Sequence, residues 1–220
     1  MLYIVDSNNF EFYAEKMEQA FRLRHDIFVD EKGWTELRRP DGREIDQFDD
    51  ENAIHMLFEQ DGEVVGYQRM LPTTRPYLLS SIYPHLSEEC LPNSPAIWEW
   101  TRFAVKKSER KRGIILSPVG NALLSGVVEW GLQNAVTDIV IEMNPLWMLR
   151  LLQLHFRVHP LGYVQKIAGE DTVAVRASFN KETLEKLQEV RGDNDPVITQ
   201  YLQINAPQIV AASAAKHEFV

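Results

Sequence analysis

Strand-like and helix-like stretches follow one another in a mixed order along this chain, and that order limits the fold to the α/β class. Short apolar or alternating runs indicate strands, and apolar residues at helical spacing indicate helices. Asp61-Gly62 is a strong turn signal, so the strands on either side of it are expected to form a hairpin. The order predicts an α/β sandwich around one twisted, mixed sheet. Strands are expected at 2–5, twice within 53–71, at 96–105, 137–143 and 171–179, and helices at 10–30, 117–135, 145–156 and 180–190.

The 220 residues are enough for one medium domain. Periodic patterning stops near residue 190, so we expect a single domain over 1–190 and a loosely ordered C-terminal extension over 191–220. Residues 72–95 are rich in proline and predict a long irregular connection with at most short helices. Connections of this length are often functional.

Charge and cysteine content exclude several classes of protein. The chain has 23 Lys and Arg residues against 32 Asp and Glu, a formal net charge of −9, which argues against general affinity for nucleic acids or anionic membranes. Cys90 is the single cysteine and the six histidines lack ligand spacing, so no disulfide, metal or cofactor is expected. The N-terminus lacks signal-peptide features, and no apolar run reaches the ~18–20 residues that span a bilayer. A cytoplasmic protein is expected.

A basic turn, "KKSERKRG", precedes the helix expected at 117–135. Ser117 is a suitable N-cap and Pro118 stands at the first helical position. Basic side chains in front of a helix N-terminus suit a phosphate or a pantetheine-type anion. A solvated basic turn has the same composition, so the motif alone leaves both interpretations open.

The stretch "RPDGREIDQFDD" combines five carboxylates with two arginines, and Pro40 and Gly42 predict that it is a loop. Just before it, "FRLRHDIFVDEKGW" supplies Arg24, Phe28 and Trp34. Such a loop is most often a solvated network of weak ion pairs, and an isolated Phe28 is most often a core residue. Carboxylates, arginines and aromatic rings together also suit a ligand that carries both positive and negative groups.

Four stretches resemble the LuxI-type acyl-homoserine-lactone synthases in order and spacing: "FRLRHDIFVDEKGW", "EIDQFDD", "VVGYQRMLPTT" and "WEWTRFAV". The resemblance implies an acetyltransferase-like (GNAT) α/β/α sandwich, in agreement with the order of elements. Thr101 stands where the family usually has serine, and it keeps the hydroxyl. The matching positions are Arg24, Phe28, Trp34, Asp46, Asp49, Arg69, Glu99 and Arg102.

The resemblance implies a two-step reaction that produces a quorum-sensing signal. The amine of S-adenosylmethionine is acylated from an acyl thioester, and the methionyl carboxylate then closes a lactone with loss of methylthioadenosine. Carboxylates and aromatic rings suit the sulfonium and ammonium, and arginines suit the carboxylate. The S-adenosylmethionine site is therefore expected to comprise Arg24, Phe28, Trp34, Asp46, Asp49 and Arg69.

Glu99 is the expected general base for the acylation step, with Arg102 in the same catalytic set. It lies on a strand between Trp98 and Trp100, where burial would raise its pKa toward neutrality. A structural salt bridge between Glu99 and Arg102 is the alternative. Lactone closure is intramolecular and is expected to depend on proximity.

The expected acyl donor is a coenzyme A thioester, with acyl carrier protein as the alternative, and either would use the basic turn. "RHDIFV", "RRPDGREIDQFD", "PLG" and the "IE" at 141–142 resemble the sub-group that uses aryl- or branched-acyl coenzyme A. Bulky residues at 143–151 suggest a short, branched or aromatic acyl chain, although an apolar helical stripe is usually core. The donor site is expected to comprise Thr101, Phe103, Val105, Arg110, Lys111, Arg112, Met143, Leu146 and Trp147.

Two other functions stay open on the sequence. A plain N-acetyltransferase of the GNAT class would use the fold and the basic turn, but it would leave Arg24, Trp34 and Asp46 without a role. A non-catalytic sensor of a nucleotide or acyl coenzyme A would bind its ligand without turnover and would tolerate the loss of Glu99.

Overall fold

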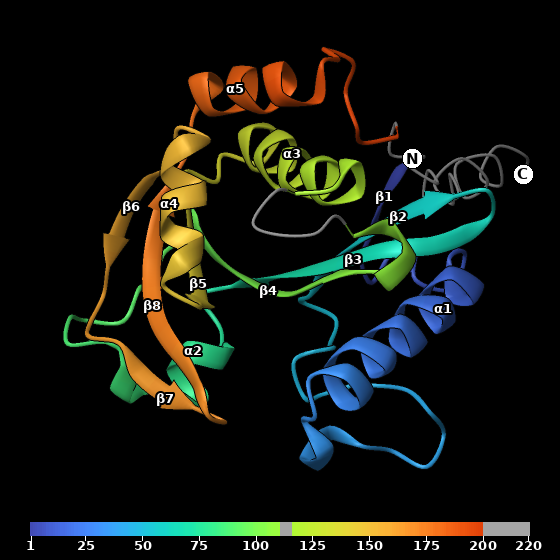
Figure 1. The fold of residues 1–220 in the computed structure, drawn as a ribbon, viewed down its shortest axis with the longest axis horizontal. Helices are drawn as coiled ribbons and strands as arrows, with labels where there is room; N and C mark the ends of the chain where they lie inside the picture. The colour runs from blue at the N-terminus through green and yellow to red at the C-terminus, as the bar shows by residue number, and fades with distance from the viewer. Residues whose placement is uncertain (111–115, 200–220) are drawn as a thin grey trace, which may run out of the picture.

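The computed structural model describes residues 1–110 and 116–199, which fold around one mixed sheet (Figure 1). The strand order is β1-β2-β3-β4-β5-β8-β6, with β7 paired to β8. Among these strands of the described residues, β4 and β5 are parallel and the other pairs are antiparallel. The strands are β1 (Leu2–Val5), β2 (Ile54–Gln60), β3 (Glu63–Pro72), β4 (Ile97–Val105), β5 (Asp138–Met143), β6 (Arg157–Pro160), β7 (Gln165–Ile167) and β8 (Glu170–Ser178). The helices are α1 (Ala14–Arg24), α2 (Leu78–Ser81), α3 (Pro118–Gln133), α4 (Leu146–Gln153) and α5 (Lys181–Arg191).

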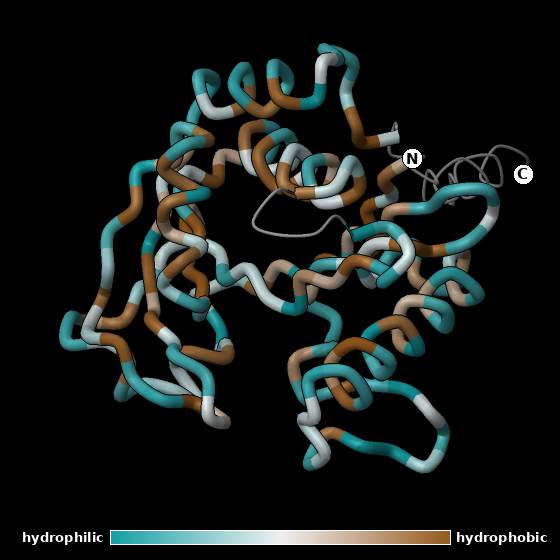
Figure 2. Tube along the Cα trace, in the orientation of Figure 1, coloured by the Kyte–Doolittle hydropathy of each residue, from teal (hydrophilic) through white to brown (hydrophobic). Residues whose placement is uncertain are grey.

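Helices cover both faces of the sheet, as the α/β prediction required (Figure 1). On one face α1 packs against β2 and β3, where Phe21, Leu57 and Tyr67 share an apolar core. On the other face lies α3, which is buried along nearly its whole length and is covered in turn by α5. Figure 2 shows apolar residues gathered along α3 and the central strands, and polar residues on the outer surface of α5. No helix of the described part is long and apolar enough to cross a membrane.

The expected elements are present, and two further strands were not predicted. Asp61 and Gly62 have φ angles of 52° and 84°, which form the predicted hairpin turn between β2 and β3. Ser117 caps α3 by accepting from the amide of Gly120 at 3.2 Å, as its residue type indicated. The missed strands β6 and β7 are four and three residues long and mostly exposed, so neither has a periodic apolar pattern.

The parallel strands β4 and β5 separate after a short stretch of pairing. Their register joins Ile97–Glu99 to Asp138–Val140, whereas the strands continue to Val105 and Met143. The unpaired halves leave an opening in the middle of the sheet. A site between them can draw on both strands at once.

Helix α1 continues into a π-helix, His25–Glu31. The amide of Lys32 donates to the carbonyl of Ile27 at 2.9 Å, five residues back, and Gly33 at φ 73° ends the segment. The predicted helix at 10–30 is therefore present, but its last part is wider than an α-helix. Single π-turns of this kind are frequent at functional sites.

Part of the expected C-terminal extension is packed against the domain. Leu2 donates to the carbonyl of Val197 at 3.2 Å, and its own carbonyl accepts from Thr199 at 2.9 Å. The carboxylate of Glu129 on α3 accepts from the amides of Val197 and Ile198. Residues 197–199 thus add to the edge of the sheet beside β1.

Candidate active site

A cavity of about 720 Å³ opens between the separated ends of β4 and β5. Its floor is made by Trp100, Thr101, Arg102 and Phe103, four consecutive residues of β4. A regular strand would turn every second side chain away. Arg102 has φ 57°, in the left-handed region, and this departure from strand geometry brings neighbouring side chains to the same cavity.

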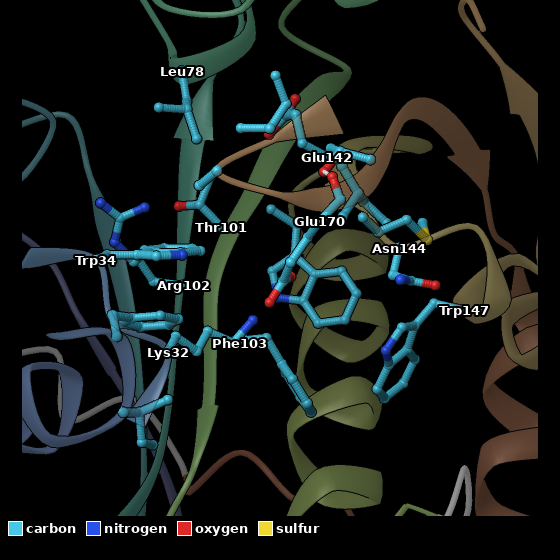
Figure 3. Close-up of a pocket in the computed structure, with 18 of the residues that line it drawn as sticks. Lys32, Trp34, Leu78, Thr101, Arg102, Phe103, Glu142, Asn144, Trp147 and Glu170 are labelled. Carbon is cyan, nitrogen blue, oxygen red and sulfur yellow. Dashed lines mark hydrogen bonds between the residues drawn. The ribbon is translucent and has the colours of Figure 1, made fainter. Parts of the chain in front are cut away.

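Figure 3 shows how the walls are arranged. Trp34 and Arg102 lie on one side, Asn144 and Trp147 on the other, and Thr101 and Glu142 between them. Of the residues predicted from sequence, ten line the cavity: Phe28, Trp34, Asp46, Thr101, Arg102, Phe103, Val105, Arg110, Met143 and Trp147.

Five predicted site residues do not line the cavity: Arg24, Asp49, Arg69, Glu99 and Leu146. The first four are buried beside or beneath its wall. Leu146 is wrong as a wall residue, because its position at the start of α4 turns the side chain outward and leaves it 63% exposed. Lys111 and Arg112 lie outside the described residues.

The two aromatic residues predicted to face a cation form one wall. The rings of Phe28 and Trp34 are stacked, with centroids 5.1 Å apart and an interplanar angle of 17°. The Arg102 guanidinium lies 5.5 Å from the Phe28 centroid and 5.8 Å from that of Trp34. Phe28 is 3% exposed, so it is a core residue and a wall residue together.

Behind this wall, three arginines and three carboxylates alternate in a closed ring of ion pairs. Each arginine bridges two carboxylates, and each carboxylate bridges two arginines, so the formal charges cancel. The order around the ring, with the shortest hydrogen-bond distances, is Arg24–Glu44 (2.6 Å), Glu44–Arg102 (3.1 Å), Arg102–Asp46 (2.8 Å), Asp46–Arg69 (2.6 Å), Arg69–Asp49 (2.7 Å) and Asp49–Arg24 (2.7 Å).

The arginines of the ring lower the pKa of two of its carboxylates, Asp46 and Asp49. Burial alone would raise the pKa of Asp46, but the hydrogen bond and charge of Arg69 lower it below its usual value. The pKa of Asp49 is lowered well below its usual range, against the effect of burial, by Arg24 and Arg69. Both oxygens of Asp46 already accept from arginines. Asp46 and Asp49 are thus both engaged with arginines, and their place in the S-adenosylmethionine site stays a prediction.

The ring includes one residue that the sequence did not single out. Glu44 is fully buried and bridges Arg24 and Arg102, although its loop composition gave no reason to separate it from its acidic neighbours. Tyr67 extends the network, with its hydroxyl 3.2 Å from Arg24 and 2.7 Å from His55 Nδ1. Burial lowers the pKa of His55 to about 4, so this histidine is neutral at physiological pH.

Glu99 is fully buried on β4. Its two oxygens accept from the amides of Leu78 and Leu79, at 2.8 and 2.7 Å. Burial raises its pKa to about 7, in the direction predicted from sequence. The alternative salt bridge with Arg102 does not form, because Arg102 belongs to the ion-pair ring.

Glu142 on β5 is a second buried acid, and it lines the cavity. Burial raises its pKa well above the usual value, and the negative charge of Glu99 raises it further. Its Oε1 is enclosed and has no hydrogen-bond partner. The sequence offered this residue only as half of the "IE" at 141–142 and gave it no role.

The opposite end of the cavity is apolar. Phe103 and Trp147 meet edge to face, with centroids 6.0 Å apart, and Met143, Leu116 and Leu151 complete this part of the wall. Because α4 turns one face to the cavity and the other to solvent, Trp147 and Leu151 point in while Leu146 points out. An acyl chain would find mostly hydrocarbon and indole surface here.

The described part of the basic turn is engaged in contacts of its own. Arg110 donates to Glu31 at 2.6 Å and to the carbonyl of Val105 at 2.6 Å, which joins the end of β4 to the π-helix at the cavity rim. Lys106 pairs with Glu63 at 2.5 Å. An anion at this turn would have to compete with these pairs or use the residues between 111 and 115.

One group of possible metal ligands lies outside the cavity. His25, Asp26 and Asp30 offer ligand atoms within 4.8 Å of one another. Asp30 is already paired with Arg38 at 2.7 Å, and Asp26 and Asp30 are exposed. This arrangement is accounted for by surface ion pairing.

Comparison with known proteins gives consistent matches. A family model described as autoinducer synthase matches residues 8–187. The isovaleryl-homoserine lactone synthase of Bradyrhizobium diazoefficiens is 34% identical over 216 residues, covering 98% of this chain and 94% of that protein. BjaI, described as a CoA-dependent acyl-homoserine lactone synthase with SAM and isopentyl-CoA, gives a TM-score of 0.84 at 34% identity, covering 90% of this chain and 92% of its own.

Two further structures extend the comparison. MesI, described as a CoA-dependent acyl-homoserine lactone synthase, gives a TM-score of 0.82 at 30% identity and covers 91% of this chain and 100% of its own. A Lactobacillus plantarum structure assigned as an N-acetyltransferase gives 0.52 at 18% identity, covering 81% and 99%. That last match shows the fold alone, and it agrees with the acetyltransferase-like sandwich expected from the sequence.

Proposed function

Because the chain belongs to the autoinducer synthase family and is an acyl-homoserine-lactone synthase, we propose that its acyl donor is a coenzyme A thioester carrying a short branched or aryl acyl group. The observation that carries this proposal is the two-sided cavity between β4 and β5. One side has aromatic rings and an ordered set of arginines, and the other is apolar and closed by Phe103 and Trp147. The acyl-carrier-protein route is the alternative for the same reaction.

S-adenosylmethionine occupies the aromatic side in this proposal. The stacked Phe28 and Trp34 offer ring faces to the sulfonium and a flat surface to the adenine. Arg102 is the ring arginine that lines the cavity, so it is the one placed to bind the methionyl carboxylate. Arg24 and Arg69 act behind it by holding Asp46 and Glu44 in place.

The chemistry then follows in two steps. The methionyl ammonium loses a proton toward Glu99, and the amine attacks the thioester carbonyl carbon, releasing the thiol. The methionyl carboxylate next displaces the sulfonium at the γ-carbon, which releases methylthioadenosine and closes the lactone. Carboxylate and sulfonium charges cancel in this second step, so a folded, enclosed methionyl chain matters more than a base.

Three observations support a coenzyme A thioester. The relative 34% identical over nearly the whole chain is an isovaleryl-homoserine lactone synthase. Both similar structures, BjaI and MesI, are described as CoA-dependent. The cavity rim adjoins the basic turn that begins at Lys106, where nucleotide phosphates would find positive charge.

A turnover assay with matched donors tests the proposal. Isovaleryl, aryl and straight-chain acyl groups are offered once as coenzyme A thioesters and once on acyl carrier protein, with methylthioadenosine and product mass as readouts. We expect turnover with branched or aryl coenzyme A donors at least about tenfold faster in kcat/KM than with carrier-protein donors, a difference of about 1.4 kcal/mol. Faster turnover with carrier protein would overturn the donor assignment and keep the synthase.

The apolar wall predicts how a substitution at Trp147 should change the preference for acyl-chain length. Trp147→Ala removes the ring that closes the acyl end, so kcat/KM for five-carbon acyl donors should fall about tenfold while eight-carbon donors gain. Leu146→Ala is the matched control, since Leu146 is its neighbour on α4 but is 63% exposed. Equal behaviour of the two variants across the donor series would show that Trp147 does not bound the acyl site.

A further inference from the structure

Glu99 and Glu142 lie on neighbouring strands and on the same face of the sheet. Glu99 pairs with Val140 in the parallel register, and Glu142 follows two residues later on β5. Side chains two residues apart on a strand point the same way. This register brings the two carboxyls near each other, and each affects the pKa of the other.

The two acids differ in what they can reach. Glu99 is fully buried, does not line the cavity, and has both oxygens tied to the first amides of α2. Glu142 lines the cavity between Thr101 and Asn144 (Figure 3), and its Oε1 has no partner. Glu99 is therefore held in place, while Glu142 is placed to meet a substrate.

Burial and the surrounding charges set the protonation of the Glu99–Glu142 pair. Burial raises both pKa values, to about 7 for Glu99, and the charge of Glu99 raises the pKa of Glu142 further. Arg69 opposes the shift at Glu99 and Arg102 opposes it at Glu142, but both arginines are committed to the ion-pair ring. Tyr77, the residue before α2, stays protonated, because burial and the charges of both carboxyls raise its pKa. Because the pKa of Glu142 is raised further by the charge of Glu99, we expect the proton of the pair to stay on Glu142 when Glu99 ionises above about pH 7.

We propose that Glu142 is the group that contacts the methionyl ammonium of S-adenosylmethionine, and that it relays the ammonium proton to Glu99. The inference rests on the proposed function and adds a residue to it. The ammonium N–H bond breaks and its proton goes to Glu142, while the proton already on Glu142 passes to Glu99. The amine keeps the electron pair with which it attacks the thioester carbonyl carbon. The pair is then doubly protonated, and the second amine proton leaves with the thiol.

The charge balance of the site favours this contact. The arginines and carboxylates of the ion-pair ring cancel, so the ring offers no net negative charge to an ammonium. Of the other acids on the cavity wall, Glu31 is paired with Arg110, and Glu36 and Glu170 are exposed to solvent. The single charge on the Glu99–Glu142 pair lies in the interior of the cavity wall, where an ammonium would be stabilised by it.

Glu142→Gln is the test variant, and Asp138→Asn, at the other end of the same strand, is the matched control. Acylation is followed by thiol release, and lactone closure by methylthioadenosine release from synthetic acyl-S-adenosylmethionine. We expect thiol release by Glu142→Gln to fall at least about 50-fold at pH 7.5 and to lack the break near pH 7 that is expected of the wild type. The rate of lactone closure from the acylated intermediate should stay within about threefold of the wild-type rate. Thiol release and lactone closure by Asp138→Asn should also stay within about threefold of the wild type.

Thermal unfolding separates this role from a structural one. A carboxyl whose pKa is raised in the folded state makes the folded protein hold more protons than the unfolded chain between about pH 4.5 and 7. Wild-type stability should therefore fall as pH rises through that window, and less so in Glu142→Gln, which is expected to have an equal or higher Tm at pH 8. A variant that unfolds instead would be replaced by Glu142→Met, for which the same kinetic result is expected.

Three outcomes would count against these proposals, and they distinguish a failure of the relay from a failure of the proposed function. Suppose that the wild type turns over and that Glu142→Gln releases thiol at a rate within threefold of the wild-type rate at every pH. This result would overturn the relay and leave the proposed function intact. Absence of product from the wild type with every thioester would instead contradict the proposed function itself. Equal losses in acylation and in lactone closure would also overturn the relay, because a proton relay acts on the first step alone.

Discussion

Replacing Arg24 with methionine is expected to lower the free energy of unfolding by about 3–5 kcal/mol, the range for a buried ion pair that loses one partner. Arg24 is fully buried and bridges Glu44 and Asp49. Methionine would leave both carboxylates enclosed, each with only one remaining arginine. Because Arg24 does not line the cavity, any effect on catalysis should come through loss of order in the loop that carries these acids.

Urea denaturation measures this change, with the midpoint compared at constant m-value. Arg43→Met is the control, because Arg43 makes its pair with Asp41 at the exposed surface and should show no resolvable shift. Adding Glu44→Gln to Arg24→Met should recover part of the loss by removing a stranded charge. A loss below about 1 kcal/mol for Arg24→Met would mean that the ring is not a cooperative unit.

Glu99→Gln is expected to reduce acylation by a factor of about 10²–10⁴, the usual contribution of a general base. The pKa of Glu99, raised to about 7 by burial, makes the carboxylate available above neutral pH. In the wild type the acylation rate should therefore fall as the pH drops below about 7. The variant should show a low rate without that dependence.

Binding of S-adenosylmethionine, followed by the fluorescence of Trp34 and its neighbours, provides the control for this variant. It should change by less than about threefold, since Glu99 is not a wall residue. Full acylation activity in Glu99→Gln would remove Glu99 from the mechanism. Binding of S-adenosylmethionine without acylation, in the wild type and in Glu99→Gln alike, would instead be the behaviour expected of a protein that binds its ligands without turning them over.

The sequence predicted this fold and much of the site because two kinds of signal agreed. Periodicity placed the main strands and helices, and the resemblance placed eight residues. All of these except Glu99 belong to the aromatic wall or to the ion-pair ring. The sequence could not show which acid forms an ion pair with which arginine. A loop with several acids and arginines has many pairings of similar energy, and only the folded backbone selects one, so Glu44 could not be separated from its neighbours.

The errors have similar physical causes. Leu146 fits the apolar pattern of α4 as well as Trp147 does, and only the packing of that helix decides which of them faces the cavity. Glu142 is two residues past the last β4–β5 pair, so its approach to Glu99 depends on a strand register that no local pattern encodes. Arg110, expected in the donor site, lines the cavity, but no local pattern indicated its bond to Glu31 of the π-helix at 2.6 Å.

The π-helix at His25–Glu31 makes the length of this segment as important as its composition. A π-turn contains one residue more than an α-helical turn, so removing a single residue between 25 and 31 would let the segment close as an ordinary helix. Side chains outside the segment would then keep their direction, whereas those inside it, Phe28 among them, would turn around the helix axis, where successive residues are about 100° apart. Phe28 would lose its stacking on Trp34 although neither had been substituted. Alignments and engineered chimeras in this region should therefore treat a one-residue gap as a change to the aromatic wall.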